Sequence, residues 1–354
     1  MLTRKKIQGM FLGGAIGDAL GRPVECMSFT QAMENYPEGV RTYLRPNNNK
    51  WFKDEKTGVI TDDTQLSLAV VLGLLEAKGF SMPAIAKYHV KALQKTVEGW
   101  APTTKEAVQR LESGISWKES GKTDNLKRGA GNGVVMKVSP LGAYHAIQKQ
   151  MKWFRFADRI VEFSAMTHYT RNSAIAAVVH SMAIAYLLWA DISYFSKDDF
   201  WEVVKLSCNG KDVKRGRKDS DHFYVGNLPP TAENYPQIAD KLDFISCMAE
   251  DKKIPTKDLI SYYENGDSQV INSLPFSYAF FLKNPYSVES IFNVVWMGGD
   301  ADTNAKIVGE MIGALHGVDI FLTKENIHLV DGLDEAQNII QLADDFCDCF
   351  GVNS

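Results

Sequence analysis

The segment GMFLGGAIGDALG, residues 9–21, has a glycine at every fourth position, and GEMIGALHG, residues 309–317, repeats this pattern far along the chain. Residues four apart lie on one face of a helix, so each segment would present a bare stripe to a neighbour. An interior glycine costs a helix about 1 kcal/mol relative to alanine, and close packing of two helices would offset that cost. We therefore expect two helices that approach closely near a central site. Chance is the alternative, because the chain contains 27 glycines.

Apolar residues recur at helical spacing along much of the chain. In residues 63–79, Leu66, Val70 and Leu74 lie four apart, and Gly79 is a residue type that often follows a helix. Short β-like runs such as GVVMKV are isolated, and no strand–helix–strand rhythm accompanies them. The pattern predicts an all-α class, with further helices at 4–20, 83–97, 103–113, 153–166, 172–190, 197–207, 236–250, 286–296, 303–316 and 333–349.

The overall composition is that of a globular chain with ordinary charge. The chain has 354 residues, of which 45% are hydrophobic and 23% charged, and its net charge is -4. This balance does not favour a nucleic-acid or membrane partner. We expect no membrane span, because no run of about 18 apolar residues occurs, and Asp18 interrupts the one patch that resembles a signal peptide. Five scattered cysteines without a CxxC pair favour a reducing compartment, and so a cytoplasmic location.

One polar stretch interrupts the helical pattern. Residues 208–236 are rich in charges, proline and glycine and are predicted to form a long surface loop. Five basic residues between Lys211 and Lys218 would suit an anionic macromolecule, but nearby aspartates favour a solvated loop. Helical pattern resumes on both sides, so the loop does not divide the chain into two domains.

The stretch GGDADTN, residues 298–304, is open to several interpretations. An EF-hand would start with Asp300, Asp302 and Asn304, but it needs glycine and glutamate where Ala305 and Met311 stand, so that reading fails. A phosphatase-type D-x-D would follow a strand of a parallel sheet, and no such rhythm is present. A plain helix start would explain one acidic cap, but not two acids, a threonine and a glycine pair together.

A second acidic stretch, TDDTQ at residues 61–65, offers the missing half of a site. Thr61, Asp62 and Asp63 also precede an apolar helix, and adjacent carboxylates repel each other unless a cation lies between them. Carboxylate and hydroxyl oxygens suit Mg²⁺, Mn²⁺ or Ca²⁺ rather than zinc or copper. If the two stretches meet, they supply enough ligands for a two-metal site. Two independent helix caps remain the alternative.

Two further stretches carry weaker signals. In GAGNGVVMKVSPLG, residues 129–142, Gly131 and Gly133 allow the backbone to approach a ligand, and Asn132 tolerates a left-handed conformation. Such a loop can bind an anion through its amides, although Gly-Asn-Gly is also ordinary in turns. In THYTRNSA, residues 167–174, His168 could serve in catalysis or simply pack in the interior.

The order of five motifs resembles that of the ADP-ribosylglycohydrolase family, the relatives of dinitrogenase reductase-activating glycohydrolase. The motifs are GAIGDALGRPVE (14–25), TDDTQLSLAV (61–70), GAGNGVVMKVSPLG (129–142), THYTRNSA (167–174) and GGDADTNAKIVGEMIGALHG (298–317). The resemblance implies a compact orthogonal helical bundle in a single domain over residues 1–354, with the charged loop inserted. It also implies two Mg²⁺ or Mn²⁺ ions and removal of ADP-ribose from a modified protein side chain or a small conjugate.

The resemblance also assigns roles by position. It implies a metal-ligand set of Thr61, Asp62, Asp63, Asp300, Asp302 and Thr303. It implies an ADP-ribose site at Gly131, Asn132, Gly133 and His168, and an acidic residue near the scissile bond at Glu25. The water proton would pass to one of Glu25, Asp62, Asp63 or Asp300, with Glu25 favoured, while Asp18 would give packing or supporting contacts.

Two features separate this chain from the family pattern. After Gly317 the sequence VDIFLTKENIHLVDG replaces the family's usual continuation, so we expect the C-terminal helices to pack differently. The loop at 208–236 lies where the acceptor could be selected. A non-catalytic ADP-ribose-binding or crystallin-like protein on the same scaffold is the alternative function.

Overall fold

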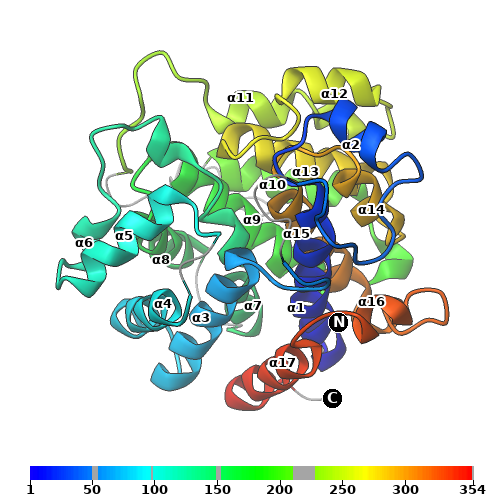
Figure 1. The fold of residues 1–354 in the computed structure, drawn as a ribbon. Helices are drawn as coiled ribbons and strands as arrows, with labels where there is room; N and C mark the ends of the chain where they lie inside the picture. The colour runs from blue at the N-terminus through cyan, green and yellow to red at the C-terminus, as the bar shows by residue number, and fades with distance from the viewer. Residues whose placement is uncertain (50–54, 97–98, 149–152, 210–227, 353–354) are drawn as a thin grey trace.

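The computed structural model describes residues 1–49, 55–96, 99–148, 153–209 and 228–352, and within these ranges the regular elements are helical and no strand forms. The all-α prediction is therefore confirmed (Figure 1). The α-helices are α1 (Arg4–Gly21), α2 (Phe29–Asn35), α3 (Asp62–Ala77), α4 (Met82–Lys95), α5 (Pro102–Glu112), α6 (Trp117–Ser120), α7 (Ser139–Ile147), α8 (Trp153–Ala165), α9 (Arg171–Trp189), α10 (Lys197–Asn209), α11 (Ile238–Asp243), α12 (Thr256–Tyr262), α13 (Val270–Lys283), α14 (Glu289–Val295), α15 (Ala301–His316), α16 (Ile327–Asp331) and α17 (Ala336–Phe350).

The two glycine-rich helices, α1 and α15, pack against each other through the middle of the molecule (Figure 1). A Cβ atom added to Gly9 would lie 2.6 Å from the carbonyl oxygen of Gly313, and one added to Gly17 would lie 2.7 Å from the amide nitrogen of Lys306. Real side chains do not tolerate such distances, so the bare stripes are required for this packing. The expectation of close approach is confirmed, and it brings the C-terminal end of α1 to the N-terminal end of α15.

Helix α9 lies in the interior and joins α7, α8, α10 and α15 in one hydrophobic core. It is long and apolar enough to cross a membrane, but 83% of its most apolar window is buried inside the molecule. Core helices of globular proteins have the same composition. The helix therefore meets the length and composition criteria for a membrane span, although no such helix was expected from the sequence. Its burial is that of a core element.

Some predicted boundaries were wrong. Residues 236–250 form the short α11 and a 3₁₀ turn at Ser246–Met248 rather than one helix, because the backbone tightens to bonds such as Met248 N to Ile245 O, 3.0 Å. The β-like run GVVMKV contains a 3₁₀ turn at Val135–Lys137. At the charged loop, α10 continues to Asn209, residues 228–236 are irregular, and residues 210–227 lie outside the described part of the chain.

Candidate functional site

The two acidic stretches lie at the N-terminal ends of α3 and α15, and both ends open into one cavity of about 500 Å³. The positive end of a helix dipole favours carboxylates at such positions. The cavity is lined by predicted residues from four segments: Glu25, Asp62, Asp63, Asn132, Gly133, Asp300, Asp302 and Thr303. Segments more than 230 residues apart in sequence therefore supply one concave, acidic site.

At the start of α3, Thr61 is the N-cap residue, since its Oγ1 accepts a hydrogen bond from the amide of Asp63 at 3.2 Å. The helix-cap interpretation thus holds for Thr61, but it does not account for the carboxylates of Asp62 and Asp63. Behind this turn, Asp18 from α1 accepts hydrogen bonds from the amides of Thr61 and Thr64 at 3.1 Å and from the Thr64 hydroxyl at 2.5 Å. Asp18 is fully buried and fixes where α3 begins.

At the start of α15, the preceding glycine pair makes a turn that other residues could not adopt. Gly298 and Gly299 have φ values of +73° and +69°, and a Cβ on Gly299 would collide with the carbonyl of Asn265. Asp300 is the N-cap residue but makes no side-chain cap; its Oδ2 instead accepts from Asn132 Nδ2 at 2.8 Å. Asp302 Oδ1 accepts from its neighbouring amide at 2.8 Å. The turn therefore aims both carboxylates at the cavity.

Glu25 joins the α15 carboxylates, whereas the α3 carboxylates stand slightly apart. Among the described residues, Glu25, Asp300 and Asp302 form a group whose ligand oxygens all lie within 4.8 Å of one another. Asp62 and Asp63 line the same cavity outside that group. The structure thus places Glu25, predicted as an acid near the scissile bond, among candidate ligands as well.

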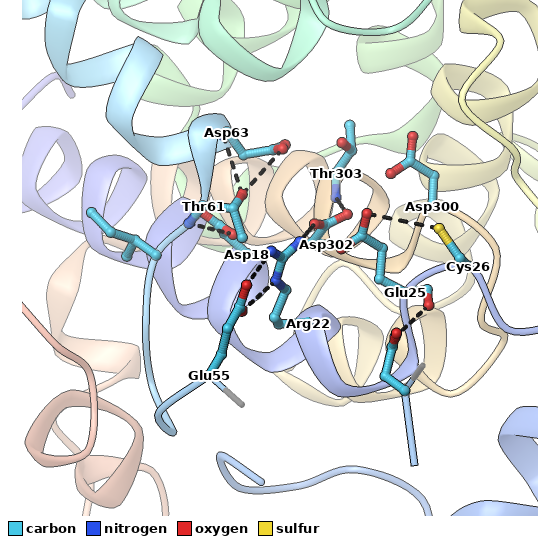
Figure 2. Close-up of polar contacts among 12 residues, drawn as sticks. Asp18, Arg22, Glu25, Cys26, Glu55, Thr61, Asp63, Asp300, Asp302 and Thr303 are labelled. Atoms are coloured by element: carbon cyan, nitrogen blue, oxygen red, sulfur yellow. Dashed lines mark hydrogen bonds and ion pairs between the residues drawn. The ribbon is translucent and has the colours of Figure 1, made fainter. Parts of the chain in front are cut away.

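A buried arginine, which the sequence analysis did not single out, lies between these acids (Figure 2). Arg22 forms ion pairs with Glu25, with Glu55 at 2.6 Å and with Asp302 at 3.7 Å. The sequence held one signal for this role: Arg22 stands three residues before Glu25 in the motif GAIGDALGRPVE, and side chains at that spacing can form an ion pair on a helical turn. Arg22 supplies one positive charge beside a cavity that is lined by seven acidic side chains.

The carboxylates that line the cavity repel one another when ionised, unless further positive charge lies between them. Burial, and then the charge of Asp302, raise the pKa of Asp62 to about 7 and raise the pKa of Asp63 well above its ordinary value. The same two causes raise the pKa of Asp300 and Glu25. Asp63 Oδ1 is buried and has no hydrogen-bond partner among the described residues. Oxygen donors, excess charge and an unsatisfied lone pair together fit a hard divalent cation.

The predicted ADP-ribose loop borders this cavity from a third side. Asn132 bridges Asp300 and Ser273, donating to Ser273 Oγ at 2.9 Å, and Gly133 lines the cavity wall. Gly131 and His168 do not line the cavity. They lie directly behind it, where a Cβ on Gly133 would be 3.0 Å from His168 Nε2. Burial lowers the pKa of His168 well below its ordinary value, so the ring is neutral near pH 7.

Comparisons with known proteins agree with this architecture. A sequence model of the ADP-ribosylglycohydrolase family matches residues 1–353. The chain is 25% identical over 343 residues to uncharacterized protein YegU of Escherichia coli, covering 94% of this chain and 95% of that one. It is 22% identical over 331 residues to ADP-ribosylhydrolase ARH3 of Xenopus tropicalis, covering 88% and 87%.

A solved structure titled "ADP-ribosylglycohydrolase-related protein complex" has the same fold, with a TM-score of 0.65, 19% identity and 98% coverage of both chains. The family model spans nearly the whole chain, and the fold and the order of the motifs agree with it. This chain belongs to the ADP-ribosylglycohydrolase family.

Proposed function

We propose that this protein is a metal-dependent hydrolase that cleaves the glycosidic bond between ADP-ribose and an acceptor, either a modified protein side chain or a small molecule. Family membership supports an ADP-ribose hydrolase activity. The observation that carries the proposal is the convergence of the carboxylates at the starts of α3 and α15 in one cavity. Two unrelated helix caps would not be expected to line the same cavity.

The residues present fit two Mg²⁺ or Mn²⁺ ions. The proposed ligands are the hydroxyls of Thr61 and Thr303 and the carboxylates of Asp62, Asp63, Asp300 and Asp302, with Glu25 close enough to contribute. When bound, divalent cations supply charge that acidifies a water molecule and polarises sugar oxygens. The unpartnered Oδ1 of Asp63 and the raised carboxyl pKa values support this assignment.

The chain's own groups then divide the remaining tasks. Glu25 lies at the cavity wall, where a carboxylate can accept the proton of the attacking water, and burial and the charge of Asp302 raise its pKa above the ordinary value and so make it a stronger base. Asn132 holds Asp300 in place and so ties the ADP-ribose loop to the acidic cluster. Glycoside cleavage develops positive charge on the ribose, and the surplus of acids over Arg22 would stabilise it.

The test is hydrolysis of a panel of ADP-ribosylated acceptors, with and without Mg²⁺ or Mn²⁺. Glu25→Gln and Asp302→Ala should abolish turnover, while Asp345→Asn, an exposed change on α17, should retain it. Near-wild-type hydrolysis in both site variants would refute the assignment.

The same proteins separate the alternative of a non-catalytic scaffold. Such a protein should release no ADP-ribose from any acceptor and show no metal-dependent rise in melting temperature, whereas a metal binder must gain stability by mass action.

A further inference from the structure

A lysine is buried directly behind the ADP-ribose loop, and the proposed mechanism does not use it. Lys137 is fully buried, and its Nζ donates to the carbonyl of Gly133 at 2.6 Å and to Thr167 Oγ1 at 3.1 Å. Among the described residues it forms no ion pair within 4.0 Å, and the charges of Asp62 and Asp63 act on it from farther away. Burying a cation without an ion pair is costly, so its position here calls for a function.

The hydrogen bonds run onward from Lys137 to His168. Thr167 Oγ1 lies 2.9 Å from His168 Nδ1. A lysine ammonium has donors only, so Thr167 must accept from Lys137, and its own hydrogen is then free to be donated. Within the described chain His168 Nδ1 is the acceptor available to that hydrogen. Nδ1 therefore carries no proton, and in the neutral ring the hydrogen sits on Nε2.

The other ring nitrogen faces the loop. His168 is 2% exposed, and among the described residues Nε2 has no hydrogen-bond partner. It lies 3.0 Å from where a Cβ on Gly133 would be and 3.5 Å from one on Gly131. This donor has no partner within the described chain, so it is open to an acceptor, which a ligand held on this loop would supply.

We propose that Lys137 and Thr167 are positioning residues, which hold His168 as the tautomer with hydrogen on Nε2 and so present one donor to an oxygen of ADP-ribose at the Gly131–Gly133 loop. This proposal rests on the proposed function for its ligand. The lysine has a second effect, because it pins the Gly133 carbonyl from behind and turns that end of the loop toward the cavity.

The tautomer can be read directly by ¹⁵N NMR of the His168 ring at pH 6, below the pKa of about 7 to which burial lowers Lys137. Wild-type protein should show hydrogen on Nε2 alone. Thr167→Val has the same shape but no hydroxyl, so it should lose this preference, and the matched control Thr167→Ser should keep it. Lys137→Met should behave as the valine variant does, and Lys137→Arg should restore the preference in part.

Binding of free ADP-ribose, measured by calorimetry, supplies the second readout. Loss of one hydrogen bond should weaken binding about tenfold in Thr167→Val and leave Thr167→Ser near wild type. Hydrogen on Nδ1 in wild-type protein, or equal ADP-ribose affinity in the valine and serine variants, would overturn the proposal. If wild-type protein has the expected tautomer but binds no ADP-ribose, the ligand assignment and the proposed function fail together. If it binds ADP-ribose but has hydrogen on Nδ1, only this inference is overturned.

Discussion

Replacing Asp62 with asparagine should stabilise the metal-free protein increasingly as the pH rises. The pKa of Asp62 is about 7 in the folded chain, against an ordinary value of 3.8, because of burial and the charge of Asp302. A carboxyl whose pKa is raised by folding favours the folded state at low pH, and this contribution is lost as the pH rises through the folded pKa. Asparagine has the same shape, can still accept the Ala101 backbone hydrogen bond and does not titrate.

The magnitude follows from the two pKa values. Between pH 5 and pH 8 the folded carboxyl stays protonated up to about pH 7, while the unfolded one is already ionised, a difference of about two pH units. To one decimal the difference is about 1.9 units, so at about 1.36 kcal/mol for each unit the free energy of unfolding should change by about 2.6 kcal/mol. An unfolding entropy of about 2.1 cal/mol/K per residue gives about 0.74 kcal/mol/K for 354 residues. The expected change in melting temperature is therefore about 3.5 °C.

The assay is thermal unfolding of wild-type and Asp62→Asn protein in chelator at pH 5 and pH 8. Comparing the two proteins cancels the contributions of buried histidines such as His89, which titrate in both. Saturating Mn²⁺ should reverse the ranking at pH 8, because wild-type protein would gain about 2.7 kcal/mol at a concentration of 100 Kd and the variant lacks one of the proposed ligands. A difference between the proteins that is independent of pH in chelator would refute the reasoning.

Three further predictions follow from named contacts. Gly9→Ala places a methyl group 2.6 Å from the Gly313 carbonyl oxygen and should lower the melting temperature by at least about 3 °C. In the control Gly79→Ala the nearest atom to the methyl group would be 3.6 Å away, so the melting temperature should stay within about 1 °C of wild type. Similar losses in both variants would show that the contact between α1 and α15 is not tight. Asp18→Asn puts an amide donor against the Thr61 and Thr64 amides and should weaken Mn²⁺ binding by calorimetry at least tenfold, and unchanged affinity would separate Asp18 from the site. Asn132→Ala frees Asp300 and should raise KM for the ADP-ribosylated substrate more than it lowers kcat, so an effect on kcat alone would contradict its place in the binding loop.

Sequence periodicity predicted most long helices well because apolar spacing reports which face is buried. The predicted segments 4–20, 63–79 and 303–316 match α1, α3 and α15 to within two residues. Helix α13 was missed, since Pro275 lies inside it and proline ordinarily breaks a helix. It forms nevertheless because its side chains are buried almost throughout, and that packing outweighs the local cost.

By itself, the sequence determined the all-α class, the two bare helix faces and the chemistry of the acidic stretches, because residue spacing and oxygen ligands are local properties. Only the tertiary structure decided which acidic side chains line the same cavity. The packing of α1 on α15 brings Glu25 to Asp300 and Asp302, and Asp18 ties the start of α3 to the same place. Arg22 and the contact between Lys137 and Thr167 also emerged only there, because distances between segments far apart in the chain depend on how whole helices pack.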